Sequence, residues 1–558
     1  MRLTFKELKD QIAKVVPKDI PYTVELEAGN IAIVTPVPNK FGGGEGLIGK
    51  IAKRVKRKIV LRPDPSIMKS EEDAKKLIKE IVPETAEITN IYFDSCYREI
   101  IIQCKNPGEA VGRRGANLNA IRDQTGWLVK VERTSPLVSK TVHDIRGYRQ
   151  VHATERRKLL KDFGLNIHRP MRPGSAWARV TALGSYREVG RACHFVTTNE
   201  SRVMIDVGVN IASDTDPMPY FTAPEALPLE KIDAVVLTHS HLDHAGMLPV
   251  LFKYGYRGPV YCTPPTRDLM LILQTDYLKV GGSEGKRAPY DMEDIRTCMK
   301  HVVDVDWGET TDIAPDIKLT FSNAGHILGS SAVHLHIGEG KHNLVFSGDQ
   351  KYEKSWLFDA ANTRFPRVET LVLESTYGAS GDYQPSRQEA NQELQDIVSR
   401  TIARGGKVIC PVFAVGRSQE VMIAIDELFR SGQVKPVPVW LDGMIQEATA
   451  IHASHPDYLT SSLRKSLLKD DGENPFTSEW FRPVKSRELR ESIIMDNSPC
   501  IVLATSGMLN GGPVMEYFRH WAHEDRNSLC FVGYQAEGTL GRRLQKGFGE
   551  VPMIIDGK

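Results

Sequence analysis

Apolar runs separated by polar turns give the front part of the chain a mixed helix and strand pattern. Residues 66–83 alternate apolar and polar positions at helical spacing, which predicts an amphipathic helix. Apolar stretches at residues 99–104 and 127–132 predict strands. From residue 177 onward the runs are bounded by Gly, Asp and Pro, as in the inner strands of a layered α/β fold; they cover residues 202–207, 234–238, 318–322, 344–347 and 370–373.

After residue 380 the pattern changes again to an alternation of strands and helices. Residues 407–413 predict a strand, residues 418–429 a helix, and residues 438–441 and 500–504 two further strands. Such alternation is typical of a doubly wound α/β module. We therefore expect an α/β protein with these parts: an N-terminal α/β domain (1–65), a second small domain (66–140), a linker (141–176), a layered domain (177–380) and a doubly wound domain (381–558).

Composition and charge narrow the classes of protein. Of the 558 residues, 41% are hydrophobic and 25% are charged, which is typical of a globular chain. No run of about 18 apolar residues occurs and the amphipathic N-terminus does not resemble a signal peptide, so we expect a cytoplasmic protein without a membrane partner. Residues 1–175 hold 33 Lys and Arg against 21 Asp and Glu, whereas the rest holds 39 against 49. A basic front half favours a polyanion as partner, although solvated helix faces give the same excess.

The eight cysteines are scattered and none forms a CxxC pair. They are expected to be buried thiols in a reducing compartment. A zinc ribbon is therefore not expected, and any metal has to be held by histidine and carboxylate side chains.

The strongest chemical signal is a cluster of metal-binding side chains directly after the apolar run 234–238. His239, His241, Asp243 and His244 fall within six residues at the carboxyl end of a predicted buried strand, where α/β sheets bind their ligands. The spacing lets His239 and His241 face one metal while Asp243 and His244 face a neighbouring one. Imidazole and carboxylate together suit zinc, with manganese or iron as alternatives. A helix cap would explain the Asp but not three histidines.

Further ligands are expected at other strand ends. His326 lies among small residues that leave room for a metal, and Asp349 and Asp206 each close an apolar strand. A carboxylate in such a place is costly unless it is paired or bound to metal. Three other histidines alternate along predicted strands and are expected to be ordinary sheet residues: His194, His334 and His336.

Two GxxG sequences in the basic half suggest loops that clamp a nucleic-acid backbone, as in KH domains. In such a loop the glycines allow close approach to about four nucleotides, and basic residues neutralise phosphate. One begins at Gly46 and ends at Gly49, followed by Lys50 and other basic residues. The stronger one precedes a predicted helix and strand and consists of Gly112, Arg113, Arg114 and Gly115.

The order of these motifs resembles a known superfamily. Asp206, His239-x-His241-x-Asp243-His244, His326 and Asp349 look like the metallo-β-lactamase motifs. The segments Leu-Val-Leu-Glu374-Ser-Thr-Tyr-Gly and Pro-Val-Phe-Ala-Val-Gly-Arg417 resemble those of its β-CASP nucleases. Together with the GxxG units, the whole chain is similar to the archaeal KH-bearing β-CASP ribonucleases, homologues of the cleavage and polyadenylation specificity factor. The implied fold is KH-type α+β domains followed by a metallo-β-lactamase αββα sandwich with an inserted β-CASP domain.

The resemblance implies two Zn²⁺ ions and a role for each site residue. The first zinc is expected on His239, His241 and His326, the second on Asp243 and His244, with Asp349 bridging both. Asp206 is expected to orient a ligand histidine, Glu374 to orient the general acid, and Arg417 to grip a substrate phosphate. Members of the family continue beyond the β-CASP domain with two more histidine motifs, so the chain resembles a C-terminally shortened member. We therefore expect an incomplete second zinc site, no general acid, and no assured homodimer.

The function expected from this resemblance is metal-dependent, endonucleolytic cleavage of single-stranded RNA, in RNA 3′-end processing or transcription termination. RNA polymerase and the transcription machinery are the implied protein partners. Two alternatives remain: a β-CASP nuclease that processes DNA, and a non-catalytic RNA-binding scaffold. The intact His/Asp cluster opposes the scaffold, and the GxxG units favour RNA over DNA.

Overall fold

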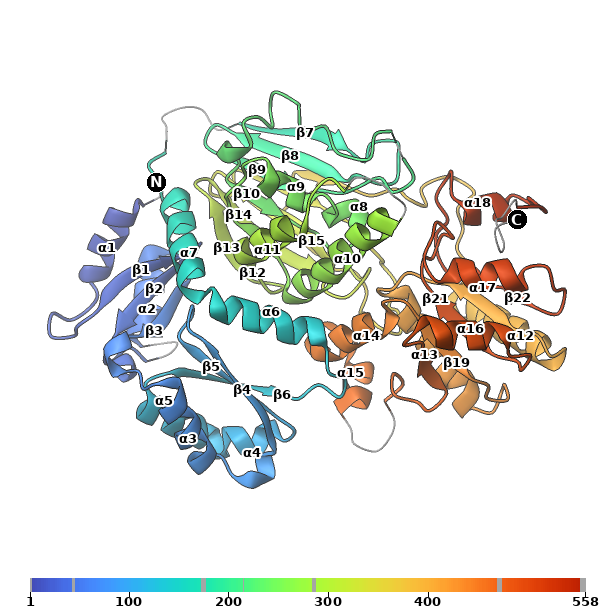
Figure 1. Ribbon diagram of the computed structural model, residues 1–558. Coiled ribbons are helices and arrows are strands. Elements are labelled where there is room, and N and C mark those ends of the chain that lie inside the picture. Colours follow the sequence, from blue (N-terminus) through green and yellow to red (C-terminus); the bar gives the residue numbers. More distant parts are fainter. Residues whose placement is uncertain are drawn as a thin grey trace.

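The computed structural model describes residues 3–42, 46–171, 177–213, 215–283, 288–468 and 474–551. Three blocks follow one another along the chain (Figure 1). Two small α/β units, in blue, lie on one side of a central layered domain, in green. A third block, in orange and red, lies on the other side of that domain.

The two N-terminal units share one plan: an antiparallel strand pair to which a third strand adds in parallel. In both, helices cover one face of the sheet and bury an apolar core. The first unit consists of α1 (Phe5–Ala13), β1 (Thr23–Glu27), β2 (Asn30–Thr35), α2 (Leu47–Val55) and β3 (Ile59–Pro63). The second consists of α3 (Glu71–Ile81), β4 (Ile88–Asp94), β5 (Glu99–Cys104), α4 (Pro107–Val111), α5 (Ala116–Thr125) and β6 (Leu128–Arg133).

The predicted linker is mostly two helices, α6 (Lys140–Val151) and α7 (Ala153–Ile167). Helix α6 contacts elements of all three blocks: β4, α10 (Pro264–Ser283) and α14 (Ile445–Ser454). Two basic residues of the linker, Arg149 on α6 and Arg156 on α7, are buried rather than solvated. Arg149 Nη1 donates to Asp304 Oδ2 at 2.6 Å, and Arg156 donates to backbone carbonyls of the central domain. Part of the basic excess of the front half therefore docks this segment instead of facing solvent.

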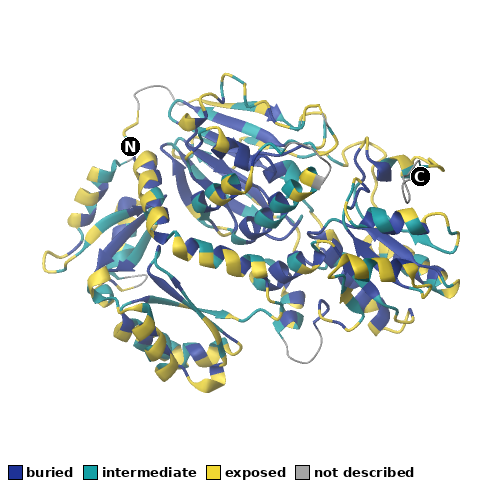
Figure 2. Ribbon diagram, in the orientation of Figure 1, coloured by how far each residue is buried: buried dark blue, intermediate teal, exposed yellow. Residues whose placement is uncertain are grey.

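The central domain is a sandwich of two sheets with an apolar core between them, and helices cover the outer face of the first sheet. The first sheet has the order β12-β11-β10-β9-β8-β7, with β7 (Ala178–Gly184), β8 (Cys193–Thr198), β9 (Arg202–Ile205), β10 (Ala234–Val236), β11 (Val260–Cys262) and β12 (Val302–Asp304). The second runs β13-β14-β15-β16-β17, with β13 (Thr310–Ala314), β14 (Ile317–Asn323), β15 (Ser331–Ile337), β16 (His342–Phe346) and β17 (Thr370–Val372). Its helices are α8 (Leu242–Ala245), α9 (Leu248–Lys253), α10 and α11 (Met292–His301). Figure 2 shows the inner strands of the sandwich as mostly buried, whereas the edge strands β7 and β17 are largely exposed or intermediate.

The third block is a parallel sheet between helices, as the alternating pattern predicts. Its strands follow the order β20-β19-β21-β18-β22, with β18 (Val408–Pro411), β19 (Val439–Asp442), β20 (Phe481–Pro483), β21 (Ile501–Ala504) and β22 (Ser528–Leu529). Its helices are α12 (Arg387–Ala403), α13 (Arg417–Arg430), α14, α15 (Ser461–Leu468), α16 (Arg487–Met495), α17 (Val514–Trp521) and α18 (Leu540–Gln545). The predicted helix 418–429 and the predicted strands 438–441 and 500–504 match α13, β19 and β21. The fold class expected from the sequence is confirmed.

Candidate metal centre

Strand ends of both central sheets converge on one cluster of histidines and aspartates. Asp206 directly follows β9, and His239 and His241 follow β10. Strands β9 and β10 run parallel, so their carboxyl ends lie at the same edge. From the second sheet come His326, in the loop between β14 and β15, and Asp349, just after β16.

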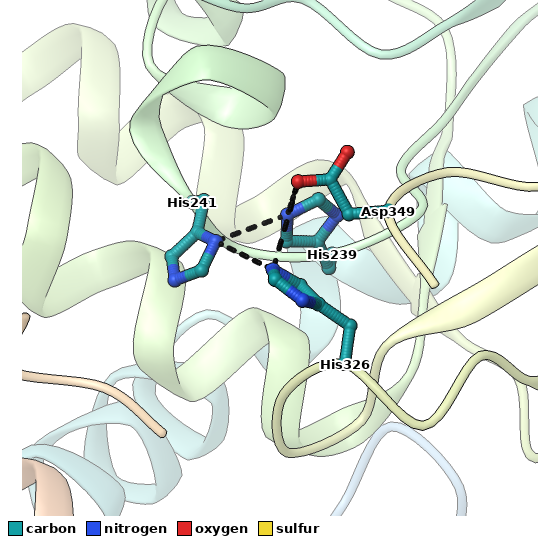
Figure 3. A group of neighbouring side chains, drawn as sticks. All are labelled: His239, His241, His326 and Asp349. Atoms are coloured by element: carbon teal, nitrogen blue, oxygen red, sulfur yellow. Dashed lines mark hydrogen bonds and ion pairs between the residues drawn. The ribbon is translucent and has the colours of Figure 1, made fainter. Parts of the chain in front are cut away.

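The first group holds four donor atoms that point toward a common centre (Figure 3). His241 Nδ1 lies 3.2 Å from both His239 Nε2 and His326 Nε2. Asp349 Oδ2 lies 3.6 Å from His326 Nε2 and 4.0 Å from His239 Nε2. Ligand atoms about 2.0–2.1 Å from a tetrahedral Zn²⁺ are separated by roughly 3.3 Å. The first group therefore fits a tetrahedral metal ion.

The second group shares Asp349 with the first. His244 Nε2 lies 3.2 Å from Asp349 Oδ1 and 3.9 Å from Asp243 Oδ2. Each of the three residues offers one donor atom, and these atoms lie within 4.8 Å of one another, close enough to bind one metal ion. Asp349 thus turns one carboxylate oxygen to each group, which is the arrangement of a bridging ligand.

Asp206 supports the second group from behind. It is 2% exposed and accepts three hydrogen bonds of 2.8 Å, from His244 Nδ1, Thr238 N–H and Thr238 Oγ1. The same Thr238 hydroxyl lies 3.0 Å from His239 Nδ1. A carboxylate behind a ligand imidazole fixes the ring and its tautomer, so that the other nitrogen faces the metal. Thr238 was not among the predicted site residues.

Close backbone contacts hold these loops together. A Cβ on Gly208 would lie 1.6 Å from the carbonyl oxygen of Asp243, so only glycine lets the strand end after β9 approach α8. Asp206 itself has a φ of +60°, a conformation uncommon outside glycine and found at functional sites. The site is therefore built on a constrained backbone.

Burial keeps the three imidazoles of the first group neutral. The pKa of His239 lies well below its ordinary value, because burial disfavours the charged form and His244 adds repulsion. Burial also lowers the pKa of His241 and brings that of His326 to about 3. Neutral imidazole is the form that binds metal ions, so these side chains are ready ligands at pH 7.

His244 differs because three carboxylates surround it. Burial alone would lower its pKa, but Asp349, Asp206 and Asp243 together raise it well above the ordinary value. In turn His244 holds the pKa of Asp349 well below its usual range, against the effect of burial. The carboxylates thus favour a positive charge at this place, which a metal ion would also supply.

Two other predicted residues lie beside the cluster rather than in it. The backbone N–H of Glu374 donates to Ser347 Oγ at 3.0 Å, and its carboxylate accepts from Thr376 N–H at 2.8 Å. Arg417 begins α13, pairs with Glu420 at 2.9 Å and depresses the pKa of His326 through its charge. Neither side chain is a donor in the two metal groups of the described residues.

One residue of the third block, Phe413, reaches the cluster and was not singled out by the sequence. Its ring centroid lies 6.3 Å from that of His241. Phe413 belongs to the Pro-Val-Phe-Ala-Val-Gly-Arg motif, which the sequence did highlight. The motif therefore covers the metal groups from the third block.

Three sheet histidines take no part in either metal group of the described residues: His194, His334 and His336. The ring of His194 packs against Phe346, and the rings of His334 and His336 contact each other. Burial lowers the pKa of His194 and of His334 to about 4.

The second GxxG sequence forms a tight turn between two helices. Gly112 ends α4, Gly115 precedes α5, and Arg113 and Arg114 are exposed between them. The φ angles of Gly112, Arg114 and Gly115 are +73°, +54° and +79°. Within the described part of the chain, neither arginine forms an ion pair. Both guanidinium groups are thus open to a ligand.

The predicted clamp at Gly46 to Gly49 is wrong as a loop. Gly46 caps the start of α2, Gly49 lies within that helix, and Lys50 is exposed on it. Gly46 and Gly115 both stand directly before a helix, but the φ of Gly46 is −70° and that of Gly115 is +79°. The preceding residues 43–45 lie outside the described residues. Gly49 stands three positions after Gly46 because it falls in the first turn of helix α2. The GxxG spacing alone therefore does not identify a clamp.

Part of the basic run after Gly49 is also used internally. Arg57 Nε lies 3.0 Å from Asp312 Oδ2, and Lys58 pairs with Glu309. Both acidic partners belong to the central domain, at or beside β13. These two cations dock the first unit on the central domain and are not free to meet a polyanion.

Among the helices of the described residues, none combines the length and apolar character that a membrane crossing requires.

Family comparisons match each of the three blocks. The model of the KH domain of transcription termination factor FttA matches residues 2–68. A beta-lactamase superfamily domain matches residues 201–390, and a Beta-Casp domain matches residues 418–544.

Curated relatives match along the whole chain. Transcription termination factor FttA of Methanosarcina mazei is 52% identical over 548 residues, covering 98% of this chain and 86% of the relative. The protein of the same name from Methanocaldococcus jannaschii is 48% identical over 553 residues, with coverages of 98% and 86%. That of Lokiarchaeum sp. is 44% identical over 554 residues, with coverages of 99% and 87%.

Proposed function

Since the chain belongs to the FttA family of archaeal transcription termination factors, which joins a KH domain to a metallo-β-lactamase/β-CASP nuclease, we propose that it cleaves single-stranded RNA. The proposal is carried by the two groups of metal-binding side chains that share Asp349. They lie where the central domain meets the third block, called the β-CASP block from here on. The cut is endonucleolytic and belongs to RNA 3′-end processing in transcription termination. RNA polymerase and other parts of the transcription machinery are the matching protein partners.

Zn²⁺ is the ion that best suits these donor atoms. Imidazole nitrogens with one carboxylate, at tetrahedral spacing, are typical zinc ligands. If two such ions were bound, they would supply a water of lowered pKa and positive charge for the scissile phosphate. The residues that would hold them are His239, His241 and His326 for the first, Asp243 and His244 for the second, and Asp349 for both.

The protein's own side chains prepare this site. Asp206 accepts from His244 Nδ1 and thereby aims Nε2 at Asp349. Thr238 sits behind His239 in the same way. Ser347 Oγ accepts from the backbone N–H of Glu374 and thereby ties that segment to the loop that carries Asp349.

RNA is captured away from the cut. The clamp from Gly112 to Gly115 presents Arg113 and Arg114 to a backbone of about four nucleotides. Arg417, exposed next to the first metal group, is the cation for a phosphate near the cut. The GxxG clamp and the metal groups thus lie on separate domains of one chain.

The test compares RNA and DNA oligonucleotides of one sequence, each in single-stranded and duplex form. Zinc-loaded protein should cut only single-stranded RNA and should release internal fragments. Metal content measured by mass spectrometry after dialysis should identify zinc rather than manganese or iron.

Three results would overturn parts of this proposal. Equal cutting of DNA would favour the DNA-processing alternative. No cutting of any substrate by metal-loaded protein would favour an RNA-binding scaffold. Fragments released one nucleotide at a time would replace endonucleolytic by exonucleolytic cleavage.

A further inference from the structure

Two partly exposed tyrosines contact each other where the central domain meets the β-CASP block. Tyr377 follows β17 in the central domain, and Tyr534 lies between β22 and α18 in the β-CASP block. Their ring centroids are 5.8 Å apart and the rings are perpendicular. Tyr377 is 49% exposed and Tyr534 is partly exposed. Such a pair is unlike a core contact, because solvent reaches both rings.

Each tyrosine lies on a segment that is anchored at the metal site. Glu374 precedes Tyr377 by three residues, and its N–H donates to Ser347 Oγ at 3.0 Å. Ser347 in turn precedes the metal ligand Asp349 by two residues. One residue before Tyr534, a Cβ on Gly533 would lie 3.3 Å from the ring of Phe413.

Phe413 completes the connection, because its ring faces the metal ligand His241 at 6.3 Å. One residue after Tyr534, Gln535 Nε2 donates to the Gly507 carbonyl at 2.8 Å and fixes the segment from the other side. The segments that carry the two tyrosines are therefore tied to loops near the first metal group.

The rings have surface left for a ligand. An edge-to-face pair uses one face of one ring and only an edge of the other. Within the described part of the chain, neither tyrosine hydroxyl makes a hydrogen bond. Arg417 belongs to the same block as Tyr534, and its aliphatic Cγ lies 4.0 Å from the position that a Cβ on Gly533 would take, one residue before that tyrosine. Partly exposed aromatic rings suit a flat nucleobase, which stacks on them.

We propose that Tyr377 and Tyr534 form a stacking site for one unpaired nucleobase of the RNA, next to the phosphate that is cut. This proposal rests on the proposed RNA cleavage. It adds a reason why the protein would select single-stranded over double-stranded RNA. Every base has a π-face, so the site accepts all four bases. A paired base hides its faces within the duplex, so the site excludes double-stranded RNA.

The experiment couples the protein change to removal of a base from the RNA. Full-length chain carrying Asp243→Ala and His244→Ala binds without cutting, and fluorescence anisotropy measures its affinity. A series of single-stranded RNAs then carries one abasic site each, moved stepwise along the strand. At one position the abasic site should weaken binding about tenfold, which is within the range for a stacked base.

Adding Tyr377→Ala or Tyr534→Ala should remove the penalty at that position and leave the other positions unchanged. Tyr377→Phe and Tyr534→Phe keep the ring and should keep the penalty. Thermal melting monitors folding of each variant.

Two results would overturn the stacking site: an abasic profile without any tyrosine-dependent position, or alanine variants that weaken binding equally for all RNAs. Cutting of intact RNA by the unmodified chain is measured in parallel. If the unmodified chain cuts RNA but the abasic-site effect does not depend on the tyrosines, only the stacking site is rejected. If the effect depends on the tyrosines but no RNA is cut, only the nuclease is rejected.

Discussion

Replacing Asp206 by Asn tests how far the supporting hydrogen bonds hold the second metal group. Asn fits the space and tolerates the φ of +60° at this position. Asn keeps one oxygen as an acceptor, but its amide NH₂ replaces the other oxygen and faces an N–H or O–H donor of Thr238 or His244. Of the three bonds of 2.8 Å, from His244 and Thr238, at least one is lost, together with the negative charge.

The expected magnitude follows from those bonds. Loss of a partner behind a ligand imidazole typically costs 10–100-fold in metal affinity. Hydrogen bonds to a buried charge contribute about 1.5–3 kcal/mol each. We therefore expect Asp206→Asn to bind the weaker metal about 10–100-fold less tightly and to lose roughly 2–4 kcal/mol of unfolding free energy.

The assay is competition for zinc with a chromophoric chelator, combined with urea unfolding. Asp233→Asn is the matched control: Asp233 is also buried and accepts from Arg202 N–H at 2.9 Å and Arg169 Nη1 at 2.7 Å, but it is not part of either metal group. The control should lose stability and keep wild-type metal affinity. If Asp206→Asn bound both metals like the wild type, the positioning role of Asp206 would be refuted.

Three further predictions concern other parts of the chain. Arg113→Asp combined with Arg114→Asp should weaken RNA binding and flatten the slope of log affinity against log salt concentration by about 1.4, because two phosphate contacts to a single strand are lost; anisotropy titrations at several salt concentrations would show an unchanged slope if this clamp does not bind RNA. Burial lowers the pKa of His301 to about 4, so between pH 6.5 and 4 the unfolded chain takes up a proton that the folded chain does not. Stability should therefore fall as the pH drops through this window, by roughly 3 kcal/mol for this residue; urea unfolding should show a weaker pH dependence in His301→Asn, and an identical dependence would refute the assignment. A chelator should lower the melting temperature of the zinc-loaded chain, since bound ions stabilise only the folded state; an unchanged melting temperature after confirmed metal loss would contradict a metal site built into the fold.

Much of the metal centre follows from local sequence. His239, His241, Asp243 and His244 share a short segment after a buried strand, so their proximity depends on no distant contact. Asp349 and His326 could be added because strand ends of a layered α/β fold gather at one edge. The β-CASP helices and strands are likewise set by local periodicity.

What the sequence could not show depends on contacts between domains. The segment 141–176 reads as a basic linker, yet Arg149 is buried against Asp304 of the central domain. Arg57 looks like an RNA contact until its partner, Asp312, is seen in space. Phe413 meets His241 only because the β-CASP block packs over the central domain. Residues far apart in sequence leave no periodic signal when they pair in this way.

The most direct test of RNA cleavage by the metal cluster is single-turnover cutting of end-labelled, single-stranded RNA by zinc-loaded protein. The comparison is with the variant Asp243→Ala/His244→Ala, which removes two donors of the second group. We predict internal cleavage by the wild type, and a rate lower by about 10³-fold or more in the variant, with RNA affinity unchanged within a few-fold. A folded variant that cuts RNA at the wild-type rate would contradict the account.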